Sequence, residues 1–590
     1  MSADPALDAM RIERPAGASP GPVEQIENSG VAAALWRKDA SAWTRDPAVA
    51  AKIQNRLGWL ALPEAMAAAG PRLKALAAEC QQAGLRRAVL LGMGGSSLAP
   101  EVFRKVFGPP PAGATAGGLD LAVLDTTDPV AIGRLAAGLD WARTLFIVSS
   151  KSGGTIEPNC LFAFFWERCA AALRTQDAAA LGAHFVAITD GGTSLEQLAQ
   201  EHRFRAVFLN PGDIGGRYSA LSYFGLVPAA LAGVDVERLL QRARAMAQAC
   251  AAGVAADENP GVRLGAEIGA WAQAGRDKLT LVAGAELAPL GAWLEQLLAE
   301  STGKQGKGIV PVAGEAAGSP GVYGQDRVFA RLALAGTPAP GLDPAWAAVA
   351  VAAGAPVITL QLSDRYDLGQ EFFRWEFATA VAGAALGINP FDEPNVQESK
   401  DNTNRVLADW GGGKARPATP AAREGALAAY PAAPGAAAPS VEAALAALVR
   451  TVRPGDYFAI MAYMEREPAI ERALEALRQA LRDRLRIATT LGFGPRFLHS
   501  TGQLHKGGAN TGVFLQLTRS LPAGQDLPIP GRSFTFGTLF AAQAAGDLEA
   551  LAAHQRRALR LDVGADPAAG LQALRALLDR AWAGAETQGA

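Results

Sequence analysis

Two segments of this chain share one design, in which a short apolar run leads through a loop of glycine and hydroxyl residues into an apolar helix pattern. The first loop, Gly92–Ser97, follows the run 88–92, and the second, Ser149–Thr155, follows the run 144–148. Such a loop between a strand and a helix directs backbone N–H groups and a helix N-terminus toward an anion. The pattern therefore predicts an α/β fold with two phosphate-binding loops, whose candidate ligands are Gly95, Ser96, Ser150, Lys151, Ser152 and Thr155.

Each loop also has a simpler interpretation, because serine and threonine cap helices for purely structural reasons. The recurrence of the design favours a sugar phosphate as the ligand. A nucleotide is less favoured, since neither loop carries the lysine-ended glycine loop of P-loop proteins or a full dinucleotide fingerprint.

Composition limits the classes of function. With 590 residues and 49% hydrophobic content, the chain can form more than one core, so at least two domains are expected. The net charge of −2 and the scattered basic residues argue against nucleic-acid binding and favour small molecules as partners. No pair of cysteines has the spacing of a zinc site or a disulfide framework, and the thiols are Cys80, Cys160, Cys169 and Cys250.

The sequence predicts a cytoplasmic protein. The first 30 residues show no secretion signal, because no basic start leads into an apolar core. Residues 344–363 are uncharged, but Gly354 and Pro356 divide them into a helix pattern and a strand pattern, so a membrane span is not expected.

The order of elements predicts parallel sheets covered by helices on both faces. A first set of strands is expected at 88–92, 121–125, 144–149, 185–189 and 206–209. A second set is expected near 279–283, 309–312, 357–362, 457–462, 487–491 and 513–517. The predicted organisation is a helical N-terminal segment, two α/β domains, an exposed linker rich in Ala, Pro and Gly, and a C-terminal part that completes the second domain; the ranges are 1–80, 81–250, 251–410, 411–440 and 441–590.

A glycine-rich segment, 213–225, contains a single arginine, Arg217. The glycines allow the backbone to approach a ligand, and the guanidinium could stabilise a developing negative oxygen there. The alternative is a turn whose arginine pairs with a surface acid.

The whole segment 213–225 resembles the first signature of the glucose-6-phosphate isomerase family. The two hydroxyl loops are similar to the phosphate-binding loops of that family and occur in the same order, and the resemblance extends from about residue 85 to about residue 405. It implies two αβα-sandwich domains of the sugar-isomerase (SIS) type, with the helical N-terminal segment and a C-terminal extension added to them.

Two further segments carry the resemblance to the residues of the reaction. Residues 297–304 are similar to the family's segment with the catalytic glutamate, which implies that Glu300 carries the proton between C1 and C2. The family's second signature matches 387–400 and implies that Lys400 is the lysine associated with the sugar ring. The chain departs from the family at Glu393, where glutamine is usual, and at Gln397, where glutamate is usual.

The family's ring-opening histidine has no counterpart at its usual place, where this chain has Asp326. The best substitutes lie in the polar, glycine-rich segment 499–512, which resembles the isomerase portion of fused transaldolase/glucose-6-phosphate isomerase proteins. An imidazole suits the ring proton because its pKa, about 6.5, lies near neutrality. His505 is favoured over His499, and the alternative is that both histidines only hydrogen-bond the loop.

The resemblance implies an isomerase that uses no metal and no cofactor. The loops would hold the phosphate, Glu300 would take the C2 proton to give a cis-enediolate, and Arg217 would stabilise that charge. A glutamate of ordinary pKa, about 4.3, is already ionised at neutral pH, so geometry is expected to matter more than a pKa shift.

Several alternatives stay open. The chain could be a sugar-phosphate sensor of the same fold, or an isomerase for a related aldose phosphate such as mannose 6-phosphate. Transaldolase activity is not expected, since no eight-fold barrel pattern is present, although a separate transaldolase could be a partner. The family implies a homodimer, but the C-terminal extension could supply within one chain what a partner subunit usually gives.

Overall fold

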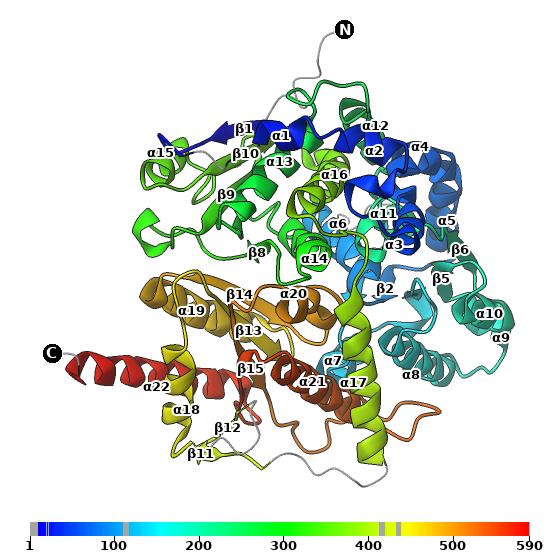
Figure 1. Ribbon diagram of the computed structural model, residues 1–590. Helices are drawn as coiled ribbons and strands as arrows, with labels where there is room; N and C mark the ends of the chain where they lie inside the picture. Colours follow the sequence, from blue (N-terminus) through cyan, green and yellow to red (C-terminus); the bar gives the residue numbers. More distant parts are fainter. Residues whose placement is uncertain are drawn as a thin grey trace.

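Three β-sheets organise the chain, and the structure is a computed structural model that describes residues 10–18, 21, 23–109, 117–411, 419–431 and 438–588 (Figure 1). The first sheet is wholly parallel, in the order β3-β2-β4-β5-β6. Its strands are β2 (Arg87–Leu91), β3 (Asp120–Leu124), β4 (Thr144–Ser149), β5 (Phe185–Asp190) and β6 (Ala206–Asn210). All five lie where the sequence predicts them, because strands buried on both faces give short apolar runs.

The second sheet has the order β1-β10-β9-β7-β8, and only β1 is antiparallel to its neighbour. Its strands are β1 (Met10–Glu13), β7 (Lys278–Ala283), β8 (Val310–Ala313), β9 (Arg327–Leu334) and β10 (Val357–Leu362). The sequence analysis missed β9 because Arg327 and Arg331 interrupt its apolar pattern. Both arginines are nevertheless buried and bonded inside the fold.

The third sheet is separate from the second, with the order β11-β12-β16-β15-β13-β14. Its strands are β11 (Ala422–Glu424), β12 (Leu427–Pro431), β13 (Tyr457–Tyr463), β14 (Ala488–Phe493), β15 (Gly512–Thr518) and β16 (Arg557–Asp562). The later strands of the predicted second set therefore form a sheet of their own, although the fold class, parallel sheets covered by helices, is confirmed. The domain boundaries given above remain a prediction.

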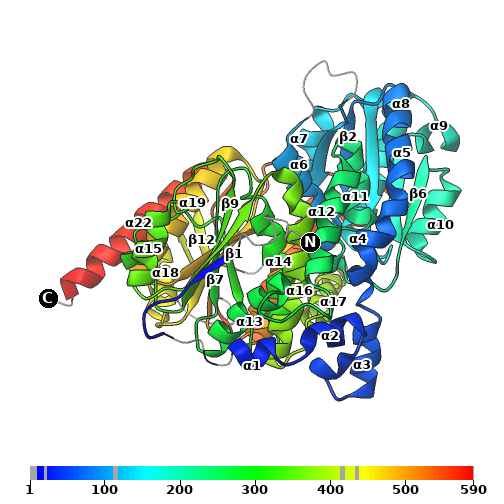
Figure 2. The same ribbon diagram turned by 90° about the horizontal axis from the view of Figure 1, so that it is seen from above.

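The buried carboxylate of Glu315 joins the second and third sheets. Arg327 Nη1 lies 3.1 Å from Glu315 Oε2, and neither side chain is exposed. Glu315 Oε1 also accepts hydrogen bonds from the backbone N and the hydroxyl of Thr489, at 3.1 and 2.7 Å. Because Thr489 belongs to β14, the third sheet is fastened directly to the second. Figure 1 shows β8 and β14 next to each other, and in Figure 2, seen from above, the two sheets overlap while the first sheet lies to one side of them.

The segment 411–440 differs from the exposed linker that its composition predicts. In the described part, β12 pairs with β16, and Leu427, Ala428 and Ala429 are buried. Small side chains fit there because the neighbouring strand and helices supply the apolar surface. Residues 412–418 and 432–437 of the predicted linker lie outside the described residues.

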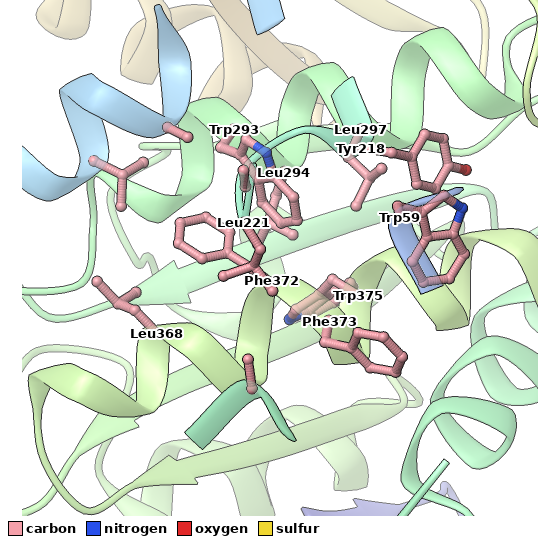
Figure 3. Close-up of a cluster of buried hydrophobic side chains, with 14 of the residues drawn as sticks. Trp59, Tyr218, Leu221, Trp293, Leu294, Leu297, Leu368, Phe372, Phe373 and Trp375 are labelled. Atoms are coloured by element: carbon pink, nitrogen blue, oxygen red, sulfur yellow. The ribbon is translucent and has the colours of Figure 1, made fainter. Parts of the chain in front are cut away.

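The N-terminal segment is helical, as predicted, and it packs against the centre of the molecule. Its helices are α1 (Val23–Glu27), α2 (Val31–Trp36), α3 (Pro47–Gln54), α4 (Leu62–Ala65) and α5 (Gly70–Gln82). Trp59, just before α4, stacks on Tyr218 with ring centroids 5.4 Å apart and also contacts Phe373 (Figure 3). Phe373 belongs to α16 (Leu368–Leu386), a helix that is almost wholly buried.

The same aromatic core holds the helix that carries Glu300. Trp293 on α14 (Leu290–Thr302) meets Phe372 of α16 edge-on at 4.8 Å (Figure 3). Tyr218 follows Arg217 directly and also packs on Phe391 at 5.4 Å. Stacked and edge-on aromatic contacts of this kind fix relative orientation as well as burying area, so α14, the Arg217 segment and the 387–400 segment share one rigid support.

The uncharged run 344–363 divides as predicted into α15 (Pro344–Ala352) and β10. Among the described residues, no helix combines the length and the apolar character that crossing a membrane requires.

Candidate active site

Both predicted phosphate loops emerge at the carboxyl edge of the first sheet. They follow β2 and β4, which are neighbours in the sheet, and the chain proceeds from β2 to β3 on one side and then to β4 on the other. Such a point, where the strand order reverses, opens a crevice at the carboxyl ends of the strands. The loops touch there, since the Ser149 hydroxyl donates to the Ser96 carbonyl at 3.2 Å.

The second loop offers two groups that the protein leaves available. The Ser150 hydroxyl is buried and has no hydrogen-bond partner among the described residues. Thr155 precedes α8 (Ile156–Leu173), and its side chain does not cap that helix, so the first N–H groups of α8 can bind an anion. Lys151 differs from the prediction, because its ammonium is paired with Asp190.

The first loop lies directly against the Arg217 segment. A Cβ atom on Gly95 would fall 2.3 Å from the carbonyl oxygen of Gly216, so only glycine permits this approach. The contact brings the loop of β2 to the residue next to Arg217. The sequence predicts that these glycines let the backbone approach a ligand, whereas the approach seen in the structure is between two backbone segments of the protein.

Arg217 is a buried residue that gathers several segments, rather than one half of a surface ion pair. It is 1% exposed, and its Nε donates to the Ser301 hydroxyl at 2.7 Å. Its Nη2 donates to the carbonyls of Pro390 and Asp392 at 2.7 and 3.0 Å. Each sheet with the helices that cover it forms one unit, numbered in the order of the sheets. These bonds join the first unit to α14 of the second and to the 387–400 segment.

Two carboxylates share the remaining nitrogen of Arg217. Nη1 lies 2.9 Å from Glu393 Oε2 and 3.3 Å from Glu300 Oε1. Glu300 is 7% exposed, and its other oxygen accepts from Gln296 Nε2 at 3.0 Å. Burial raises the pKa of Glu300 to about 7, with Arg217 opposing the rise and the charge of Glu393 adding to it.

This pKa corrects the expectation of an ordinary glutamate that is fully ionised at neutral pH. The sequence could not show it, because the shift arises from burial in the folded protein. A carboxylate that is half protonated near neutrality can both accept and return a proton.

Lys400 lines a cavity of about 230 Å³ between the first sheet and the C-terminal part. It lies on α17 (Pro394–Gly411) and faces residues 154–157 of the second loop and its helix. Arg532 also lines this cavity. Neither cation is within 4.0 Å of a carboxylate in the described part of the chain, so the cavity is suited to an anionic ligand.

The histidine on this cavity is His499 and not His505. His499 Nε2 lies 2.9 Å from Glu157 Oε1, and that buried oxygen also accepts from Gln543 Nε2 at 2.7 Å. His499 reaches the cavity from the loop after β14, whereas Glu157 lies in the first turn of α8. A buried carboxylate thus fixes the orientation of the imidazole.

His505 points into the core of the third unit. The short helix α20 (Gly502–Gly507) places it against Tyr457 and Phe514, with ring centroids 6.2 and 5.1 Å away. Burial, together with Lys506 and Arg556, lowers the pKa of His505 to about 3, so it stays neutral at physiological pH. The structure therefore favours the histidine that the sequence analysis ranked second.

Gln296 connects the two halves of the site. Its amide donates both to Glu300 and to the carbonyl oxygen of His499, the latter at 2.8 Å. Gly94 of the first loop lies beside the same groups, since a Cβ atom there would fall 2.8 Å from His499 Cβ. The Arg217–Glu300 group and the His499 cavity are therefore contiguous.

Sequence analysis missed four residues of this site. Gln296 precedes Glu300 by one helical turn, and Glu157 lies two residues after the second loop, so their positions gave a weak signal. Gln543 and Arg532 gave none. Among the described residues, no cluster of three or more His, Cys, Asp or Glu side chains could hold a metal ion.

Comparison with known proteins shows that the sequence is similar to one family. Residues 78–334 match the family model described as phosphoglucose isomerase. A glucose-6-phosphate isomerase of Thermosynechococcus vestitus is 36% identical over 225 residues, which are 36% of this chain and 39% of that protein. The glucose-6-phosphate isomerase of Symbiobacterium thermophilum is 29% identical over 398 residues, covering 60% of this chain and 87% of that protein.

Among solved structures, the hypothetical protein TT0462 of Thermus thermophilus aligns with a TM-score of 0.56 and 25% identity. That alignment covers 68% of this chain and the whole of the other. The similarity to the glucose-6-phosphate isomerase family is thus confirmed, while the aligned part spans about 39% of the length of the first relatives.

The contact between Gly95 and Gly216 leads to a prediction. Gly95→Ala should remove phosphate binding, because its methyl group would displace the Arg217 segment from the loop. Isothermal titration calorimetry with inorganic phosphate measures the effect. Gly253→Ala, at an exposed turn outside both loops, is the matched control, since a Cβ atom there meets nothing within 4 Å. Equal binding by wild type and Gly95→Ala would show that the first loop is not part of the anion site.

Proposed function

We propose that this protein is an aldose-ketose isomerase that interconverts glucose 6-phosphate and fructose 6-phosphate. The proposal starts from the match of residues 78–334 to the phosphoglucose isomerase family model. The observation that carries the proposal is the buried Glu300 carboxylate against Arg217, beside two hydroxyl loops. A proton-carrying base next to a fixed cation is the arrangement that a 1,2-proton transfer needs.

The proposed reaction moves one proton between neighbouring carbons. The sugar phosphate binds through Ser150, Thr155 and the N-terminus of α8. After the ring opens, Glu300 takes the proton from C2 of the aldose and returns it to C1, while a proton moves from the C2 hydroxyl to the C1 oxygen. Arg217 stabilises the negative charge of the cis-enediolate between these steps.

Ring opening is assigned to His499 and Lys400, which line the same cavity. His499 shuttles the proton between the ring oxygen and the C1 hydroxyl, and Glu157 holds the imidazole in place through Nε2. Lys400 donates toward the ring oxygen. No metal or cofactor is needed for this sequence of proton transfers.

Every side chain of the proposed site comes from one polypeptide. Glu157 and Arg217 belong to the first α/β unit and Glu300 to the second, whereas His499 and Gln543 belong to the part after residue 441. We infer that the third unit supplies what a second subunit would otherwise give, so neither a homodimer nor a separate transaldolase is required. A cytoplasmic location rests on the family alone.

Two other functions remain as competitors. A sugar-phosphate sensor of the same fold would bind without conversion, but it has no use for a base whose pKa lies near neutrality. Mannose 6-phosphate differs from glucose 6-phosphate only at C2, and its conversion would use the same groups. Assays with both aldose phosphates distinguish the three functions.

The test of the proposal is conversion of fructose 6-phosphate to glucose 6-phosphate by the purified protein, compared with Glu300→Gln. The variant should lose turnover by at least about 10³-fold, because the amide cannot accept the proton, while it still binds the sugar phosphate. Binding without conversion by the wild type would support the sensor instead. Unchanged turnover in Glu300→Gln would remove Glu300 from the mechanism.

Replacing each of the two candidate histidines should lower turnover to a different extent. His499→Gln should lower turnover of fructose 6-phosphate by about 10² to 10⁴-fold, the range of general acid–base catalysis. His505→Gln, a change outside the cavity, should lower turnover less than His499→Gln in protein of equal folded content. Steady-state kinetics, with circular dichroism as the check on folding, decides between them. The reverse order of effects would restore His505 as the ring-opening residue.

The carboxylates of Glu300 and Glu393, which share Arg217, determine how kcat/KM should depend on pH. Glu300 must be ionised to accept a proton, so kcat/KM should rise with pH through about 7. Glu393→Gln removes a negative charge that raises the pKa of Glu300, so the acidic limb should move to lower pH. Glu398→Gln is the control, because Glu398 pairs with His554 instead. An acidic limb that does not move in Glu393→Gln contradicts the assignment.

A further inference from the structure

A second cavity lies in the third unit, at the carboxyl ends of its parallel strands. Its volume is about 470 Å³, and it shares no lining residue with the cavity that contains Lys400 and His499. Tyr463, Thr518 and Asp562, the last residues of β13, β15 and β16, form its floor. The carboxyl ends of parallel strands, at a point where their order reverses, are the usual place for a ligand in such sheets.

The walls of this cavity are mostly apolar. Helix α21 (Phe536–Ala553) contributes Phe540 and several alanines, and α17 contributes Trp410. Tyr430 of β12 closes one side. Aromatic walls around a cavity of this size fit a small molecule with a flat apolar body.

Three hydrogen-bond donors in this cavity have no acceptor among the described residues. The Nη1 atom of Arg560 donates to nothing, while its Nε bonds Gln516 Oε1 at 2.6 Å and its Nη2 bonds the carbonyl of Ala544 at 2.8 Å. The hydroxyl of Tyr430 and the indole N–H of Trp410 also lack partners. The cavity therefore offers donors without matching acceptors.

The guanidinium of Arg560 has no ion-pair partner in the described part of the chain, and Asp547 and Asp562 act on its charge only from a distance. No carboxylate of the described residues lies within 4.0 Å of its guanidinium, whose bonds reach only neutral oxygens. These acids have other partners: Asp547 pairs with Lys506, Asp562 accepts from Thr518, Ser520 and Gly564, and Glu549 pairs with Arg405. An anionic group on the ligand would complete the pairing of Arg560.

We propose that this cavity is a second ligand site, which binds a small aromatic molecule bearing one carboxylate or sulfonate, with the anion on Arg560 and the ring between Trp410, Tyr430 and Phe540. The site is independent of the isomerase reaction proposed above. It gives the third unit a binding role in addition to its contribution of His499.

The test uses the full chain and 8-anilinonaphthalene-1-sulfonate, an aromatic sulfonate whose fluorescence rises in an apolar site. One equivalent should bind saturably. Arg560→Met should weaken binding by about tenfold, as expected for the loss of one charge-assisted contact. Ala541→Trp should abolish binding, because Ala541 lies on the cavity wall of α21 and is exposed enough to accept a larger side chain without unfolding.

Two controls keep the result specific. Ala553→Trp adds the same ring at the exposed end of α21, outside the cavity, and should leave binding unchanged. Excess fructose 6-phosphate should not displace the probe. Displacement by the sugar phosphate, or equal binding by wild type and Ala541→Trp, would overturn the proposal, and neither outcome depends on whether the protein is an isomerase.

Discussion

The buried guanidinium of Arg217 is the contact on which the arrangement of the site depends. It binds the Ser301 hydroxyl, two carbonyls of the 387–400 segment, Glu393 and Glu300 with a single planar group. A buried charge is costly unless all its donors are satisfied, so these partners cannot separate without exposing it. The same contacts that compensate this charge therefore position the carboxylates of Glu300 and Glu393.

The aromatic core explains why this arrangement is rigid. Tyr218, the neighbour of Arg217, lies between Trp59 and Phe391, and α14 is held against α16 through Trp293 and Phe372 (Figure 3). The third unit is then fastened to the second through Glu315, which pairs with Arg327 and accepts two hydrogen bonds from Thr489. It thereby brings His499 to the loop of β2 and to Glu157, so the third unit completes a site that the first two units begin.

Local pattern in the sequence predicted the strands of the first sheet and both hydroxyl loops, because each depends on neighbouring residues. Glu300 and Lys400 were singled out by the resemblance to the family, which also supported Arg217. β9 and β16 were missed, since Arg327, Arg331 and Arg557 interrupt their apolar patterns and find hydrogen-bond partners only in the folded chain. The choice of histidine could not be made from sequence. The turn of α20 sends His505 into the core, and the partner of His499, Glu157, is far away in the chain.

The central claim, that one chain forms the whole site, is tested most directly by the turnover of fructose 6-phosphate per chain on dilution from micromolar to nanomolar protein, with the molar mass measured at each concentration. The account predicts constant turnover per chain, including at concentrations where the protein is a monomer. Turnover that is lost as a dimer dissociates into inactive monomers would contradict it, because the site would then need a residue from a second chain.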